Sequence, residues 1–152
     1  MFIYIKDKSD RIVNLDSVSS IALLDKDHRV VFNMAYPCTL SSMGTKKEGV
    51  EIADYIYWDS YSDDELNALL QCQYVNDNFI KFPNHNRLIN KQHIASIKID
   101  ENRKRIIINI KCSIRLYAGA DLSSDFIFID APNDEMFTQY KGVVLSLING
   151  GI

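Results

Sequence analysis

Short apolar runs separated by polar clusters fill most of the chain, and this pattern predicts strands joined by tight turns. In the first half a helix is expected after the strands, because Ser62 is a good N-cap and three acidic residues follow it. Leucines at helical spacing extend that helix to Tyr74–Asn76. The expected strands are Phe2–Lys6, Arg11–Asn14, Val18–Leu24, Arg29–Tyr36 and Val50–Asp59.

The second half repeats this order of elements. Segment Arg87–Ile110 aligns on Arg11–Met34 without a gap, and six of the 24 aligned positions are identical. Such self-similarity indicates one structural unit used twice. We therefore predict an α+β fold built by internal duplication, in which each copy is an antiparallel sheet of four to five strands followed by one helix. The copies are residues 1–76 and 77–152, packed about a pseudo-twofold axis into one compact unit.

The last helix is expected to begin after Asn133, and its apolar residues from Met136 to Ile148 fall on one face. Several strands are apolar on both faces, so each sheet needs a cover on both. The helix of each copy covers one face. We expect the second copy, or another subunit of a homo-oligomer, to cover the other. These strands are Val30–Met34, Tyr55–Trp58, Ile106–Ile110 and Phe126–Ile129.

Composition indicates a cytoplasmic protein. No apolar stretch approaches the length of about 18 residues that a membrane-spanning helix needs, so no membrane contact is expected. The N-terminal residues lack the apolar core of a secretion signal. Cys38, Cys72 and Cys112 are widely spaced and odd in number, which is typical of reduced thiols.

Motifs for catalysis or for metal binding are missing from the sequence. The histidines His28, His85 and His93 have no partner at metal-ligand spacing. Segment Gly44–Gly49 has the glycine spacing of a phosphate loop but lacks the Lys-Ser/Thr that should follow. We predict no catalytic residue, no metal, no cofactor and no enzymatic activity.

Charge separates the two halves. Residues 1–76 carry 7 basic and 12 acidic residues, a net charge of −5, whereas residues 77–152 carry 10 and 8, a net charge of +2. Residues 81–115 alone hold 9 basic residues against two acidic ones, Asp100 and Glu101. The two copies therefore share an apolar pattern and differ in charge.

The candidate binding face lies in this basic segment. Alternate residues along 109–117 are polar, basic or aromatic, and period two places them on one face of a strand. The matching positions of the first half carry no charge, so a binding surface is expected in the second half. An ordinary solvated face, with Lys and Arg protecting a sheet edge, is the alternative. The candidate residues are Lys98, Arg103, Lys104, Arg105, Asn109, Lys111, Arg115 and Tyr117.

Two further groups of residues are candidates. Tyr57, Trp58 and Tyr61 could anchor a protein contact, although core packing also explains large aromatics on a strand. Asn33 and Asn109 each interrupt an apolar strand. Their side chains are expected either to bond a bulge or neighbouring backbone, or to act as a pair at an interface.

These observations favour a non-enzymatic binding protein that occupies the surface of a partner protein. Richness in Ile, Asn, Lys and Asp is typical of AT-rich genomes, so a bacterial or phage origin and an inhibitor or regulator encoded by a phage or mobile element are expected. The partner's identity cannot be read from the sequence. The alternative is a single-stranded nucleic-acid-binding protein that uses the basic face. Strands followed by a helix, twice over, resemble in element order the single-stranded DNA-binding folds of the Whirly type and halves of pleckstrin-homology-like domains.

Overall fold

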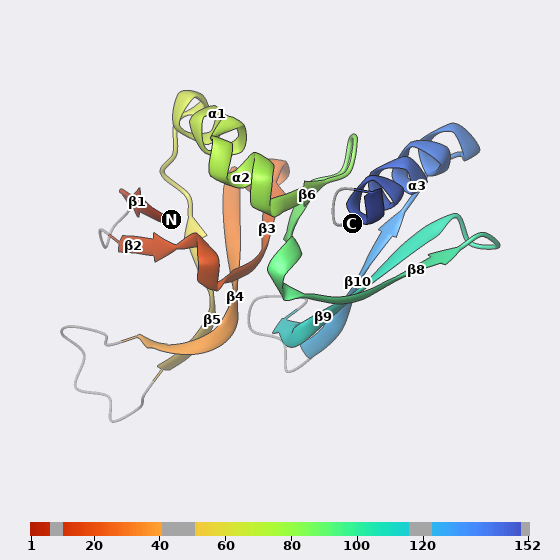
Figure 1. Ribbon diagram of the computed structural model, residues 1–152. Helices are drawn as coiled ribbons and strands as arrows, with labels where there is room; N and C mark the ends of the chain where they lie inside the picture. The colour runs from red at the N-terminus through yellow and green to blue at the C-terminus, as the bar shows by residue number, and fades with distance from the viewer. Residues whose placement is uncertain (7–10, 41–50, 116–122, 150–152) are drawn as a thin grey trace.

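The structure is a computed structural model that describes residues 1–6, 11–40, 51–115 and 123–149 (Figure 1). Short 3-10 turns at Leu15–Ser17, Asp25–Asp27 and Lys91–His93 connect some of the strands. The elements in chain order are β1 (Phe2–Ile5), β2 (Arg11–Asn14), β3 (Val18–Leu24), β4 (Arg29–Leu40), β5 (Glu51–Trp58), α1 (Asp63–Gln71), α2 (Gln73–Asn78), β6 (Phe79–Lys81), β7 (Arg87–Asn90), β8 (Ile94–Asp100), β9 (Arg105–Arg115), β10 (Ser123–Asp130) and α3 (Asp134–Asn149).

Antiparallel sheets and a C-terminal helix confirm the predicted α+β class. The described strands form a five-stranded sheet in the order β5-β4-β3-β7-β6, a three-stranded sheet in the order β10-β9-β8 and a two-stranded sheet of β1 and β2. Strand β7 pairs with β3, with Ala22 opposite Arg87. The five-stranded sheet therefore draws strands from both halves of the chain, which the sequence pattern does not predict.

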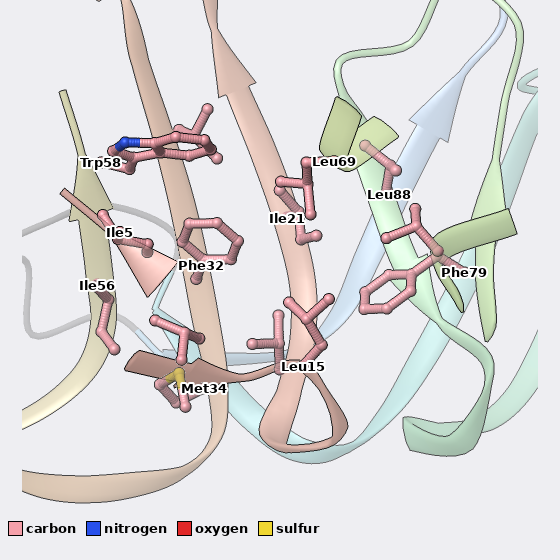
Figure 2. Packing of buried hydrophobic residues seen from close by; sticks show 14 of the residues in the cluster. Ile5, Leu15, Ile21, Phe32, Met34, Ile56, Trp58, Leu69, Phe79 and Leu88 are labelled. Atoms are coloured by element: carbon pink, nitrogen blue, oxygen red, sulfur yellow. The ribbon is translucent and has the colours of Figure 1, made fainter. Parts of the chain in front are cut away.

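Each large sheet buries one face under helices, and two apolar clusters result. Ile21, Phe32 and Ile56 lie side by side across β3, β4 and β5, and they pack with Leu69 of α1 (Figure 2). In the three-stranded sheet, inward-facing isoleucines of the β8–β9–β10 pairing pack against α3 through Phe137 and Tyr140. Full burial of one such side chain contributes roughly 1.5–3 kcal/mol to the stability of the fold. The two clusters therefore hold each sheet against its helix.

The predicted helix start at Ser62 is confirmed. The Ser62 hydroxyl accepts a hydrogen bond from the Glu65 backbone N–H at 3.2 Å, and the Glu65 carboxylate accepts one from the Ser62 backbone N–H at 2.8 Å. This reciprocal pair is a capping box. The predicted end of the helix is wrong, because Cys72 is extended (φ −64°, ψ 145°) and divides the segment into α1 and α2. The break lets Val75 become fully buried.

The second faces of the two large sheets differ from each other. In the five-stranded sheet this face carries Ser20 and Asn33, which are 0% and 5% exposed. Strand β9 of the second half lies against β3, β4 and β5. In the three-stranded sheet the corresponding face carries Phe126 and Phe128, which are exposed. Within the single chain, the second half thus covers this face of the five-stranded sheet, whereas the face that carries Phe126 and Phe128 is open.

Candidate functional site

The exposed side of the three-stranded sheet, opposite α3, is called the outer face here. Its rows follow from the strand register: Ser96 lies opposite Asn109, which lies opposite Phe126, and Lys98 is aligned with Phe128 across the intervening Ile107. Two strand spacings, roughly 10 Å, separate the backbones of β8 and β10. The outer face consists of Ser96, Lys98, Asp100, Arg105, Ile107, Asn109, Lys111, Phe126, Phe128 and Asp130.

Two neighbouring phenylalanines form the aromatic part of the outer face. Phe126 and Phe128 are 37% and 42% exposed, and their ring centroids are 4.8 Å apart. They are two residues apart on β10 and so point to the same side. Exposed large aromatics placed together on a sheet offer ring faces to a flat ligand.

Arg105 is held against this aromatic pair. Its guanidinium carbon lies 4.0 Å from the centroid of the Phe128 ring. The guanidinium also donates to both carboxylate oxygens of Asp130, with Nη2 at 3.0 Å from Oδ2. The hydrogen bond to Asp130 is the main reason that the pKa of Arg105 is raised. Arg105 therefore positions the Phe128 ring while Asp130 neutralises much of its charge.

Lys98 and Lys111 supply the exposed positive charge of the outer face. Lys98 is exposed and forms no ion pair with any residue that the structure describes. The ammonium of Lys111 donates to the backbone carbonyl of Gln92 at 2.8 Å, which leaves further donors for a ligand because an ammonium has three. These lysines stand on either side of the Ser96–Asn109 row.

The remaining predicted residues lie at the two ends of the outer face. Arg103 and Lys104 are in the turn between β8 and β9, and Lys104 pairs with Asp134 at 2.7 Å. Lys104 has a φ of 50°, in the left-handed region that tight turns use. Arg115 ends β9, but its side chain lies outside the described residues, as do Tyr117 and the loop Gly44–Gly49.

The two asparagines make equivalent hydrogen bonds in the two large sheets. The Asn33 side-chain amide donates to the Ser20 hydroxyl at 3.0 Å, and that of Asn109 donates to the Ser96 hydroxyl at 2.8 Å. Both bonds lie beside register shifts, in β3 before Ser20 and in β8 before Ser96. The asparagines thus bond across a bulge, which agrees with the structural interpretation of the sequence, although the partner is a hydroxyl and not backbone.

The aromatic candidates of the first half are largely internal. Trp58 and Tyr61 are 5% and 8% exposed and belong to the first core cluster. Their selection as contact residues is corrected for this reason, because a buried ring presents no surface to a partner. Tyr57 is half-buried, and the Arg29 guanidinium lies 4.4 Å from its ring centroid.

Sequence reasoning missed Phe126 and Phe128. They alternate with Ile127 and Ile129, so period two already places them on the opposite side from the buried isoleucines. Aligning β10 with β9 would have placed Phe126 opposite Asn109 and Phe128 opposite Ile107, on the candidate face. The equivalent face of the five-stranded sheet is buried. Alternation of residues along a strand therefore does not by itself show whether a face is covered or open.

No group of three His, Cys, Asp or Glu side chains that could hold a metal ion occurs within the described ranges. Among the same residues, no helix is long and apolar enough to cross a membrane. The chemistry that the described outer face offers is ring stacking, hydrogen bonding by amide and hydroxyl groups, and attraction of anions.

Comparison with known proteins gives one likeness. No family model matches the chain, and no curated protein matches it. The structure is similar to the LytTr DNA-binding domain of a methyl-accepting/DNA response regulator from Bacillus cereus, with 14% sequence identity and a TM-score of 0.47. The alignment covers 94% of this chain and 95% of that one.

This finding contradicts the leading expectation from the sequence. That expectation was a protein that occupies a partner protein's surface, whereas the similar structure is described as a DNA-binding domain. The partner-protein interpretation, including the phage or mobile-element inhibitor, is therefore corrected and not pursued. Nucleic-acid binding was the alternative that the sequence left open.

Proposed function

We propose that the protein binds single-stranded nucleic acid on the outer face of its three-stranded sheet and that it acts without catalysis. The observation that carries the proposal is the pair of exposed rings, Phe126 and Phe128, beside unpaired Lys98. Unpaired bases stack on aromatic rings at a gain of roughly 1–3 kcal/mol per base, and lysines attract the phosphates between them. A sheet surface gives both groups fixed spacing.

The outer face suits a single strand better than a duplex. The phenylalanines stand on a sheet surface, and bases can reach such rings only when they are unpaired. No described helix presents a basic face of the kind that enters a major groove, because Lys141 of α3 is the single basic residue in α1, α2 and α3. The net charge of −3 argues that binding is local to this face and does not come from the overall field.

Gel-shift titration with an oligothymidylate at low salt tests the proposal. Wild-type protein should shift the oligonucleotide, and the shift should weaken as salt rises because phosphate contacts release counterions. The variant Lys98→Glu/Lys111→Glu should lose the shift. Lys6→Glu/Lys26→Glu makes the same charge change at exposed positions of the first half and should retain it.

Two results would reject the proposal. One is the absence of any shift by wild-type protein at low salt. The other is an equal loss of the gel shift in the two double variants, which would show that binding depends only on the net charge of the protein. A double-stranded probe of the same length separates single-strand binding from general attraction to phosphate.

We also infer that the two halves arose by duplication of one unit. The inference is supported by matching contacts at equivalent positions. Arg29 pairs with Asp59 and stacks on Tyr57 just as Arg105 pairs with Asp130 and stacks on Phe128. Asn14 and Asn90 each accept a hydrogen bond from the backbone N–H two residues later. In this view only the second copy has an open sheet face, so only it would bind.

A further inference from the structure

A pocket of about 500 Å³ lies between the edge strand β10 and the turn that joins β6 to β7. Its volume is within the usual range of small-ligand sites. One wall is the aromatic pair of the outer face, and the other is a polar turn. The lining residues are His85, Asn86, Arg87, Phe126, Ile127 and Phe128.

Contacts with the rest of the protein hold the polar wall in place. The backbone carbonyl of Asn86 accepts a hydrogen bond from the Leu23 N–H at 2.7 Å, and the Pro83 carbonyl accepts one from the Tyr140 hydroxyl at 3.0 Å. Asn84 has a φ of 55°, which closes the turn tightly. The wall is thus anchored to both β3 and α3, and a ligand would meet it largely preformed.

Arg87 is a partly buried cation in this wall. Burial alone lowers its pKa, since no carboxylate of the described residues pairs with it. Leaving a guanidinium partly out of water without an anion is costly. An anion that enters the pocket would remove that cost, and the planar guanidinium is well suited to a phosphate.

His85 adds a second donor. Its Nδ1 accepts a hydrogen bond from the Arg87 backbone N–H at 3.2 Å. Burial and the charge of Arg87 lower the pKa of His85, so the ring is neutral near pH 7. A neutral ring that accepts at Nδ1 carries its proton at Nε2. The wall therefore offers a cation and an imidazole N–H next to two phenyl rings.

We propose that this pocket holds one nucleotide of the bound strand, with its phosphate on Arg87 and His85 and its base against Phe126 and Phe128. The inference deepens the proposed function and rests on it, because the same phenylalanines form the outer face. It identifies Arg87 as a specific phosphate ligand, in contrast to Lys98 and Lys111, which attract the strand from the open face.

Oligothymidylate binding by Arg87→Met, followed by fluorescence anisotropy, tests the pocket. Loss of a charge-assisted contact should weaken binding about tenfold to a hundredfold. Lys6→Met removes an exposed cation at the end of β1, in the first half, and should leave the affinity within about twofold of wild type. Thermal melting should show Arg87→Met to be at least as stable as wild type, because a partly buried cation with no carboxylate partner among the described residues has been removed.

A second measurement uses the unaltered protein and does not depend on how the variant folds. Thymidine monophosphate should shift the NMR signal of the Arg87 Nε–H group, and thymidine, which lacks the phosphate, should not. Equal shifts with the two probes, or no shift with either, would reject the proposal that Arg87 binds a nucleotide phosphate in this pocket.

The outcomes separate the two proposals. Wild-type affinity of Arg87→Met, with binding lost in Lys98→Glu/Lys111→Glu, would reject the pocket and keep the outer face. A shift of the Arg87 signal by thymidine monophosphate without any oligonucleotide binding would keep a nucleotide pocket and reject the outer face.

Discussion

The guanidinium of Arg105 lies over the ring of Phe128, 4.0 Å from its centroid, and is tied at the same time to Asp130. The contact covers one side of the Phe128 ring and orients it on the outer face. In the first half the same place is taken by Arg29 over Tyr57, but there β9 lies against the sheet. The same arginine–aromatic contact therefore lies on an open sheet face in the second half and on a covered one in the first.

Truncating the exposed rings should weaken nucleic-acid binding and leave folding intact. Phe126→Ala/Phe128→Ala removes two stacking surfaces, each worth roughly 1–3 kcal/mol per base. Phe2→Ala alters another exposed phenylalanine, 70% exposed on β1, and should not change affinity. Anisotropy with oligothymidylate measures the effect, and a double variant that binds like wild type would show that the rings are not in contact with bases.

The two asparagines should differ in their effect on stability. Asn33→Ala leaves Ser20 buried without its donor, which should cost about 1–3 kcal/mol. Asn109→Ala breaks the same bond where water can replace it, so the cost should stay within about 0.5 kcal/mol. Urea unfolding of both variants checks the difference. Equal losses would mean that burial does not decide the strength of this contact.

Removing the helix cap at Ser62 should destabilise the protein by about 1 kcal/mol, because Ser62→Ala leaves the Glu65 backbone N–H without its side-chain acceptor. Ser146→Ala is the matched control. The Ser146 hydroxyl donates to the Val143 carbonyl at an exposed position of α3, where alanine is a better helix former. Urea unfolding should show a loss only for Ser62→Ala.

Acid should remove part of the stability of α1 through Glu65. Hydrogen bonds from the Ser62 backbone N–H and hydroxyl lower the pKa of Glu65 below its unfolded value. A lowered folded pKa means that the contribution is complete above the unfolded pKa, near 4.3, and disappears as pH falls through the folded value. Glu65→Gln should therefore flatten the fall in unfolding free energy below about pH 5. A variant with the wild-type pH profile would contradict the assignment.

Much of the fold follows from local signals. The caps at Ser62 and Asn133 and the period-two strands depend on neighbours in sequence, and the structure places helices and strands there. The outer face is also predictable in part, since the alternation that selects Lys98, Asn109 and Lys111 holds. The break at Cys72 is different, because no proline or glycine marks it and the burial of Val75 decides it.

Long-range packing accounts for what the sequence could not indicate. Phe126 and Tyr55 occupy equivalent strands with the same alternation, yet the contacts of β9 determine which sheet is covered. The pocket at Arg87 requires residues 40 positions apart to meet across the β10 edge. The pairing of β3 with β7 joins residues more than 60 positions apart. No periodic pattern of residues in the sequence predicts any of these contacts.

The pairing of β3 with β7 has a consequence for how the protein unfolds. Phe79 and Leu88, from the second half, are 3% exposed in the core cluster of the first. A chain cut after residue 76 would lose both side chains and bare the hydrogen-bonding edge of β3, a template for aggregation. We expect one cooperative transition for the intact chain, with the late arrival of β7 at β3 slowing folding because a long loop must close first. If the two halves arose by duplication of one unit, that unit no longer folds stably by itself in this chain.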